Sequence, residues 1–164
     1  MATQLKNLSD FSETDVPSAA PYHFGIVVAE WNADITNALY QGAYESLIDH
    51  GALPQNIFTY SVPGSFELIS GADILLKNKK LDAVICLGCV IQGETRHFDF
   101  ICNAVANGIS NVSLKYSKPV IFGVLTTDNQ QQATDRAGGK HGNKGDEAAV
   151  TAIKMAHLAE TLKA

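Results

Sequence analysis

Four short segments carry side chains that could bind and transform a small molecule. Each segment directly follows a run of apolar residues. Together they contain an aromatic ring, hydroxyls, carboxylates, a histidine and a glycine turn, a combination that suits a flat, polar and partly anionic ligand. The segments are residues 31–32, 63–67, 92–97 and 126–128.

Trp31, the only tryptophan, is expected at the mouth of such a pocket. Its ring could stack on a heteroaromatic ligand or could cap the hydrophobic core. Ser65 is predicted to cap the N-terminus of a helix, which would leave Glu67 in the first turn beside free backbone N–H groups. There Glu67 could contact a ligand or simply complement the helix dipole.

The segment that ends at His97 suggests anion binding and proton transfer. Gly93, Glu94 and Thr95 precede a predicted helix whose free N–H groups could hold a phosphate. His97 lies in or next to the first turn, where the positive helix end disfavours a charged imidazolium. The neutral ring could then accept a proton, although a histidine at a helix start can also be purely structural.

Arg136 and Lys144 are predicted to form a basic pair beside and within a glycine-rich link, residues 138–145. If the link is mobile, the pair could clamp a phosphate, with the arginine binding in bidentate fashion. The two cations could equally be solvated surface charges. Glu147 could orient either cation or be an ordinary acidic residue in the first turn of a helix.

Other patterns argue against metal and nucleotide chemistry. Cys86 and Cys89 have CxxC spacing, but in a predicted strand residues three apart point to opposite faces, so both are assigned to the core. Cys102 makes the number odd, and reduced thiols are expected. The chain contains no GxGxxG or GxxxxGK[ST] motif, and its other histidines lack the spacing of a zinc site. The usual sequence signals of a dinucleotide, nucleoside-triphosphate or zinc site are therefore missing.

Composition narrows the range of partners. The chain has 164 residues, of which 46% are apolar and 18% charged, as expected for one globular domain. Its formal charge of −5 lacks the basic field that nucleic acids or anionic membranes attract. No apolar segment reaches the ~18 residues that a bilayer crossing needs. A soluble, cytoplasmic protein is expected.

The arrangement of apolar runs predicts the elements that must position these residues. Residues 1–21 are polar and aperiodic and are expected to form an extended arm, followed by one domain at 22–164. Strands are predicted at 22–29, 56–62, 83–91 and 120–125. Helices are predicted at 34–50, 65–77, 98–115, 129–137 and 146–162.

Strands separated by helices imply a parallel sheet that is covered on both faces. The predicted fold is therefore a three-layer α/β/α sandwich with a four-stranded parallel sheet. Ligands of such sheets bind beyond the carboxyl ends of the strands, which is where the four polar segments lie.

Four separated motifs closely resemble the lumazine synthase family. The resemblance begins at about Tyr22 and continues to the C-terminus, with the motifs in the family's order and spacing. It implies a flavodoxin-like version of the three-layer fold. The motifs are VPGSFEL at 62–68, GCVIQGETRHFDF at 88–100, FGVLTTD at 122–128 and QATDRAGGKHGNKGDEAA at 132–149.

The resemblance implies a transferase of riboflavin biosynthesis. It would condense 5-amino-6-(D-ribitylamino)uracil with 3,4-dihydroxy-2-butanone 4-phosphate to form 6,7-dimethyl-8-ribityllumazine, phosphate and water. The family needs no cofactor or metal for this reaction. His97 would move protons during imine formation and phosphate elimination.

The resemblance also assigns substrate-binding residues. Trp31 would stack on the pyrimidine, in place of the phenylalanine found in many relatives. Arg136 would be the main phosphate ligand, with Lys144 near the substrates. These two residues and Phe122 would come from a neighbouring subunit. The remaining contacts implied by the resemblance are Asn32, Ser65, Phe66 and Glu67 for the ribityl chain, Val90 and Ile91 for the ring pocket, and Glu94 and Thr95 for the phosphate.

The family's assemblies imply partners for this chain. A homopentamer is expected, and the short GNKG-containing link resembles members whose pentamers pack into an icosahedral shell. The arm would add a strand to a neighbour's sheet and cover its open edge. Riboflavin synthase is a further candidate partner.

Two other classes of protein share parts of this pattern. A non-catalytic flavin-binding or lumazine-binding protein, or a shell component, could use the same Trp31 pocket. A flavodoxin-like electron carrier would copurify with flavin. A response-regulator-like switch would need an acidic cluster at the strand ends, which the sequence lacks.

Overall fold

Four strands form one parallel sheet in the computed structural model, which describes residues 7–11 and 15–163. The strands lie in the order β2-β1-β3-β4. Every residue of β1 is buried because helices cover both faces of the sheet, which accounts for its unbroken apolar sequence. The strands are β1 (Phe24–Ala29), β2 (Ile57–Val62), β3 (Ala83–Ile91) and β4 (Val120–Thr127).

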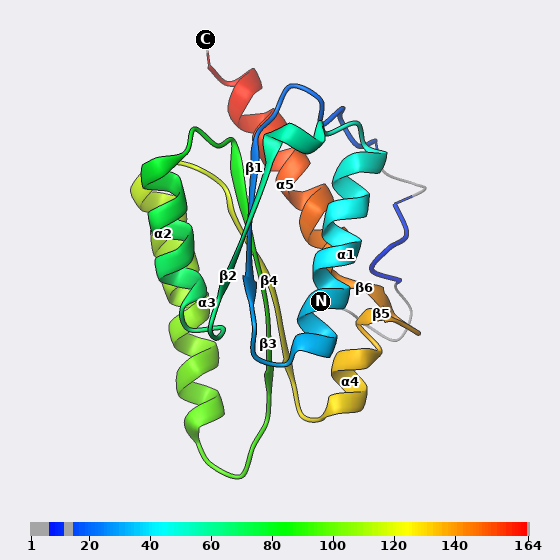
Figure 1. Ribbon diagram of the computed structural model, residues 1–164, viewed down its shortest axis with the longest axis vertical. Coiled ribbons are helices and arrows are strands. Elements are labelled where there is room, and N and C mark those ends of the chain that lie inside the picture. The colour runs from blue at the N-terminus through cyan, green and yellow to red at the C-terminus, as the bar shows by residue number, and fades with distance from the viewer. Residues whose placement is uncertain (1–6, 12–14, 164) are drawn as a thin grey trace.

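Two layers of helices enclose the sheet (Figure 1). The helices α1 (Ala33–Asp49) and α5 (Lys144–Thr161) bury one apolar face against it, and α2 (Leu68–Asn78) and α3 (His97–Tyr116) bury the other. The predicted three-layer α/β/α sandwich is confirmed. A single 3-10 turn (Pro54–Asn56) precedes β2.

The close contact between α1 and α5 depends on Gly145. A Cβ atom at this position would lie 1.9 Å from the carbonyl oxygen of Leu39, so only glycine lets the two backbones approach. Asn143 caps the start of α5, because its side-chain oxygen accepts a hydrogen bond from the Gly145 N–H at 2.8 Å. These contacts fix the position of Lys144, which is the first residue of α5.

The glycine-rich link differs from its prediction. The helix expected at 129–137 is shorter, α4 (Gln130–Thr134), and an antiparallel hairpin of β5 (Ala137–Gly139) and β6 (Gly142–Asn143) follows it. The Lys144 N–H donates to the Arg136 carbonyl oxygen at 2.8 Å across the base of this hairpin. The link therefore contains regular structure, and paired backbone groups connect the two cationic residues.

Part of the predicted arm lies on its own chain. Ala19 is buried and its N–H donates to the carbonyl oxygen of His50 at 2.8 Å. Leu8 is also buried, against the β5–β6 hairpin. The expected addition of a strand to a neighbour's sheet stays a prediction, and residues 1–6 and 12–14 of the arm lie outside the described residues. Within residues 7–11 and 15–163, no helix has the length and hydropathy to span a membrane.

Candidate active site

A cleft of about 680 Å³ opens at the carboxyl ends of β1, β2 and β3. Its walls come from the loops that follow these strands and from the first turns of α3. Gly64 and Gly93, which line it, belong to the predicted segments, whereas sequence reasoning gave Cys89, Phe98 and Ile101 no place in the site. The predicted residues that do line the cleft are Trp31, Asn32, Ser65, Phe66, Glu67, Val90, Ile91, Thr95 and His97.

Two exposed aromatic rings stand at the mouth of the cleft. The side chain of Trp31 is 75% exposed and that of Phe66 is 50% exposed. A tryptophan this exposed does not cap the core, so the stacking interpretation is the one that the geometry supports. The Trp31 N–H donates to the carbonyl oxygen of Pro63 at 3.1 Å and thereby ties the first loop to the second.

Asn32 connects two of the loops that form the cleft. Its backbone is left-handed, with φ 61° and ψ 48°, a conformation that asparagine tolerates better than most residues. In this position the side-chain Nδ2 donates to the Cys89 carbonyl oxygen at 2.9 Å. Asn32 therefore holds the start of α1 against the end of β3, a role that sequence reasoning did not assign.

The turn after β2 corrects the prediction for Ser65. The helix α2 begins at Leu68, so Ser65 is not its N-cap, and the Glu67 N–H donates instead to the Gly64 carbonyl oxygen at 3.2 Å. The Ser65 hydroxyl is buried at the cleft wall and has no hydrogen-bond partner among the described residues. A buried hydroxyl without a partner costs about 1–3 kcal/mol, which a bound polar ligand could recover.

His97 is the first residue of α3, as predicted. Its side chain is exposed and lines the cleft. Its backbone N–H donates a long hydrogen bond, of 3.4 Å, to the Thr95 hydroxyl. Within the part of the chain that the structure describes, the imidazole has no hydrogen-bond or ion-pair partner. Its nitrogens are free to exchange a proton with a ligand.

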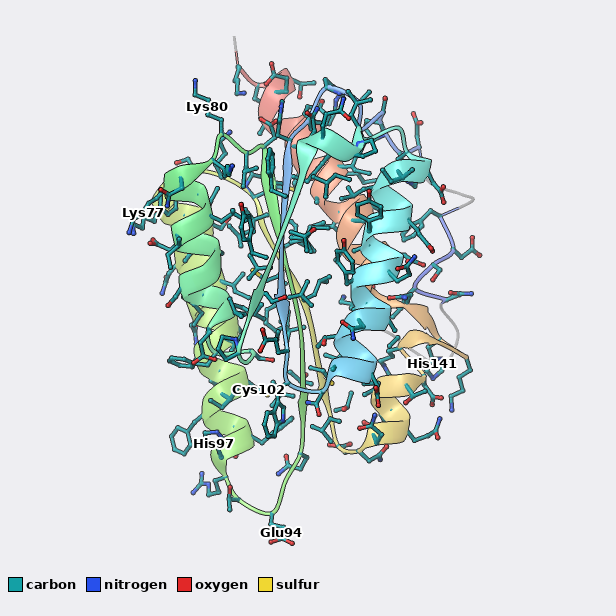
Figure 2. The ribbon with its side chains drawn as sticks, in the orientation of Figure 1. Lys77, Lys80, Glu94, His97, Cys102 and His141 are labelled. Atoms are coloured by element: carbon teal, nitrogen blue, oxygen red, sulfur yellow. The ribbon has the colours of Figure 1, made fainter. Side chains whose placement is uncertain are left out.

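The remaining predicted residues do not line this cleft. Glu94 is exposed on the loop between β3 and α3, and Figure 2 shows it at the tip, beyond His97. Phe122 is half-buried in an apolar hollow between α3 and β4. Figure 2 also shows the hairpin residue His141 on the opposite side of the molecule from His97.

Arg136 and Lys144 meet in a second hollow of about 160 Å³ at the edge strand β4. One Arg136 guanidinium nitrogen, Nη1, donates to the Gln132 carbonyl oxygen at 3.1 Å. Lys144 Nζ pairs with Glu147 at 2.7 Å, so Glu147 orients the lysine, as one of its two interpretations held. No carboxylate pairs with the guanidinium among the described residues, which leaves its charge available to an anion.

The cysteines behave as predicted for core residues. Cys86 packs in the core beneath α2 and α3, and Cys89 packs in the core beneath α1 and α5, on opposite faces of the sheet. Burial raises the pKa of the Cys86 thiol to about 12 and that of Cys89 to about 11. Neither thiol is therefore a nucleophile at neutral pH. Among residues 7–11 and 15–163, no cluster of three His, Cys, Asp or Glu side chains could hold a metal ion.

Comparisons with known proteins place the sequence in one family. Residues 21–160 match the family model described as 6,7-dimethyl-8-ribityllumazine synthase. A protein of that name from Cytophaga hutchinsonii is 64% identical over 162 residues, which cover 99% of this chain and all of the relative. Another from Parabacteroides distasonis is 56% identical over 158 residues, covering 96% of this chain and 99% of the relative.

The single tryptophan allows a direct test of the cleft. Binding of 6,7-dimethyl-8-ribityllumazine should quench the fluorescence of Trp31, because the heterocycle would stack on the exposed indole. The variant Trp31→Ala should bind this compound about tenfold more weakly, as measured by equilibrium dialysis, since a stacked ring contributes roughly 1–3 kcal/mol.

Phe100→Ala is the matched control, because Phe100 is also largely exposed but is not among the residues that line the cleft. This variant should keep the affinity of the unmodified chain. Saturation with the compound without any change in tryptophan emission would contradict stacking on Trp31.

Proposed function

The chain belongs to the 6,7-dimethyl-8-ribityllumazine synthase family, and from this premise we propose that its cleft is one half of an active site that a second copy completes. The protein is a transferase that condenses 5-amino-6-(D-ribitylamino)uracil with 3,4-dihydroxy-2-butanone 4-phosphate. The products are 6,7-dimethyl-8-ribityllumazine, phosphate and water. The proposal rests on one observation, which is that the residues expected in a single active site lie in two different hollows. Trp31 and His97 line the cleft, whereas Arg136 lines the second hollow.

The uracil substrate would occupy the inner part of the cleft. Its ring would stack on Trp31 and rest against Val90 and Ile91, which lie at the end of β3. The ribityl chain carries several hydroxyls and needs polar partners. The residues proposed to contact it are Asn32, Ser65, Phe66 and Glu67, of which Ser65 has a buried hydroxyl with no hydrogen-bond partner in the described part of the chain.

The phosphate of the second substrate would lie at the start of α3. This helix has 20 residues, and its first N–H groups and dipole favour an anion. Glu94 and Thr95 are exposed on the loop that leads into it and would supply backbone N–H and hydroxyl contacts. The phosphate would then lie next to His97.

His97 would move the protons that the condensation requires. When the 5-amino group attacks the ketone, a proton must leave the nitrogen and another must reach the departing oxygen, and phosphate elimination and ring closure need further transfers. A positioned acid or base contributes about 10²–10⁴-fold to such steps. The remaining acceleration would come from holding the two substrates together.

Phe122, Arg136 and Lys144 would complete the cleft of a neighbouring subunit. No carboxylate among the described residues pairs with Arg136, and a bidentate guanidinium suits a phosphate. All three residues lie on or beside β4, the edge strand of the sheet. An edge can face a second copy of the chain, which an interior strand cannot.

A homopentamer is the assembly that we propose, with an icosahedral shell of pentamers as its larger form. Leu114 is 76% exposed on α3, beside the apolar hollow of Phe122, and such surfaces favour burial between subunits. Among the described residues, the other edge strand, β2, pairs with β1 alone, and its outer side would receive a neighbour's arm. A cytoplasmic location and a riboflavin synthase partner stay predictions.

Replacing His97 should slow the chemistry without harming the fold. His97→Ala is expected to lower kcat by about 10²–10⁴-fold, because the exposed imidazole would move protons and makes no hydrogen bond or ion pair among the described residues. KM for both substrates and the sedimentation coefficient should stay close to those of the unmodified protein. Steady-state absorbance of the lumazine product measures the rate, and full activity of the variant would remove His97 from the mechanism.

Replacing Arg136 should affect one substrate. Arg136→Ala is expected to raise KM for 3,4-dihydroxy-2-butanone 4-phosphate by about tenfold or more, since a charged hydrogen bond to phosphate is lost. KM for the uracil substrate should change by less than about twofold. Equal losses for both substrates would contradict the role given to Arg136.

Lys140→Ala is the matched control for this experiment. Lys140 is an exposed cation of the same hairpin segment, but its amine pairs with Asp135 at 3.0 Å and does not line the second hollow. Its removal lowers the net charge equally and should leave both KM values unchanged.

A further inference from the structure

The first described stretch of the arm, residues 7–11, is hydrogen-bonded to the β5–β6 hairpin. The Leu8 N–H donates to the carbonyl oxygen of His141, and the Asn143 N–H donates to the hydroxyl of Ser9, both at 2.8 Å. The Ser9 N–H in turn donates to the side-chain oxygen of Asn7 at 2.9 Å. The arm and the hairpin therefore meet through backbone and side-chain hydrogen bonds rather than through a loose contact.

Leu8 also lines the hollow beside the two cations. Its side chain is only 5% exposed and lines the same space as Arg136 and Lys144. Thr127, at the end of β4, lines it too, and the hydroxyl of this threonine is buried without a partner among the described residues. One apolar side chain of the arm thus packs beside the residues proposed to bind phosphate.

Gly142 provides the surface on which the arm lies. Its φ of +79° is left-handed, which favours glycine. A Cβ atom there would lie 2.0 Å from the side-chain oxygen of Asn7 and 2.8 Å from the backbone nitrogens of Leu8 and Ser9. The hairpin and the arm are therefore so close that only glycine, which has no side chain, fits at position 142.

The same contacts extend to the start of α5. Asp146 lies two residues after Lys144 and accepts a hydrogen bond from Ser9. Burial and the carboxylates of Glu45 and Asp49 raise the pKa of Asp146, and the bond from Ser9 opposes this rise. Ser9 therefore joins the hairpin, through Asn143, to the first turn of the helix that carries Lys144.

We propose that Leu8 and Ser9 are positioning residues for Arg136 and Lys144. By holding the hairpin between the two cations in one arrangement, they would set the direction in which the guanidinium and the amine face a phosphate in the neighbouring cleft. Bidentate binding depends on such orientation, and small displacements of a binding group are costly. This inference rests on the proposed function, in which Arg136 binds the phosphate of the second substrate.

The test compares Leu8→Ala and Ser9→Ala in the assembled enzyme. Each variant should raise KM for 3,4-dihydroxy-2-butanone 4-phosphate by about tenfold, with kcat and KM for the uracil substrate within about twofold of the unmodified values. Hydrogen exchange of the backbone amides at 137–143 should be faster in both variants. Leu8→Met, which keeps an apolar side chain of similar volume, should restore KM.

Val16→Ala is the matched control, because Val16 belongs to the same arm and packs on the core but does not line the hollow. It should leave KM for the phosphate substrate unchanged. Faster exchange at 137–143 without a change in this KM, in both arm variants, would overturn the inference. An equal loss for both substrates, or dissociation of the assembly in sedimentation, would overturn it as well, because the arm would then act through general stability.

Arg136→Ala, measured beside these variants, distinguishes a failure of the positioning role of the arm from a failure of the phosphate role of Arg136. If it raises KM for the phosphate substrate while the arm variants do not, the positioning role fails and the phosphate site stands. If it leaves that KM unchanged, the proposed phosphate role of Arg136 fails, and the positioning role fails with it.

Discussion

Parallel pairing of the strands is the constraint on which the rest of this structure depends. Because all four strands run the same way, the loops that follow them emerge at one end of the sheet. β1 and β3 are neighbours in the order β2-β1-β3-β4. The helix that follows β1, α1, packs on one face of the sheet, and the helix that follows β3, α3, packs on the other face. The two departures open a crevice between neighbouring strands, and the cleft of Trp31 and His97 lies there.

In the proposed active site, the same constraint divides the residues between two copies of the chain. β4 lies at the edge, so the segment that follows it turns onto the α1 and α5 side and carries Arg136 and Lys144 away from the cleft. Within one chain, Trp31, which is proposed to stack on the uracil ring, and Arg136, which is proposed to hold the phosphate, line different hollows. The proposed assembly would bring the β4 edge of one copy against the cleft of another and unite them, and it would then have a catalytic as well as a structural role.

Sequence reasoning succeeded where local patterns decide the structure. Continuous apolar runs indicate buried parallel strands, and the polar residues after them therefore lie at one rim, which placed Trp31 and His97 correctly. It failed where tertiary contacts decide. Ser65 has a typical capping side chain, but an irregular turn delays α2 to Leu68. The contact of Leu8 with His141 joins residues far apart in the sequence and leaves no periodic signal in either segment.

The most direct test of the divided site is complementation between two impaired variants, with the phosphate substrate held well below its KM. His97→Ala and Arg136→Ala chains, each with its own affinity tag, would be coexpressed, and assemblies holding both would be purified through the two tags in turn. With equal and random incorporation, about one quarter of the interfaces would pair an intact His97 with an intact Arg136, and a similar fraction of the unmodified activity should return. Activity no greater than the mean of the two separate variants would contradict an active site shared between chains.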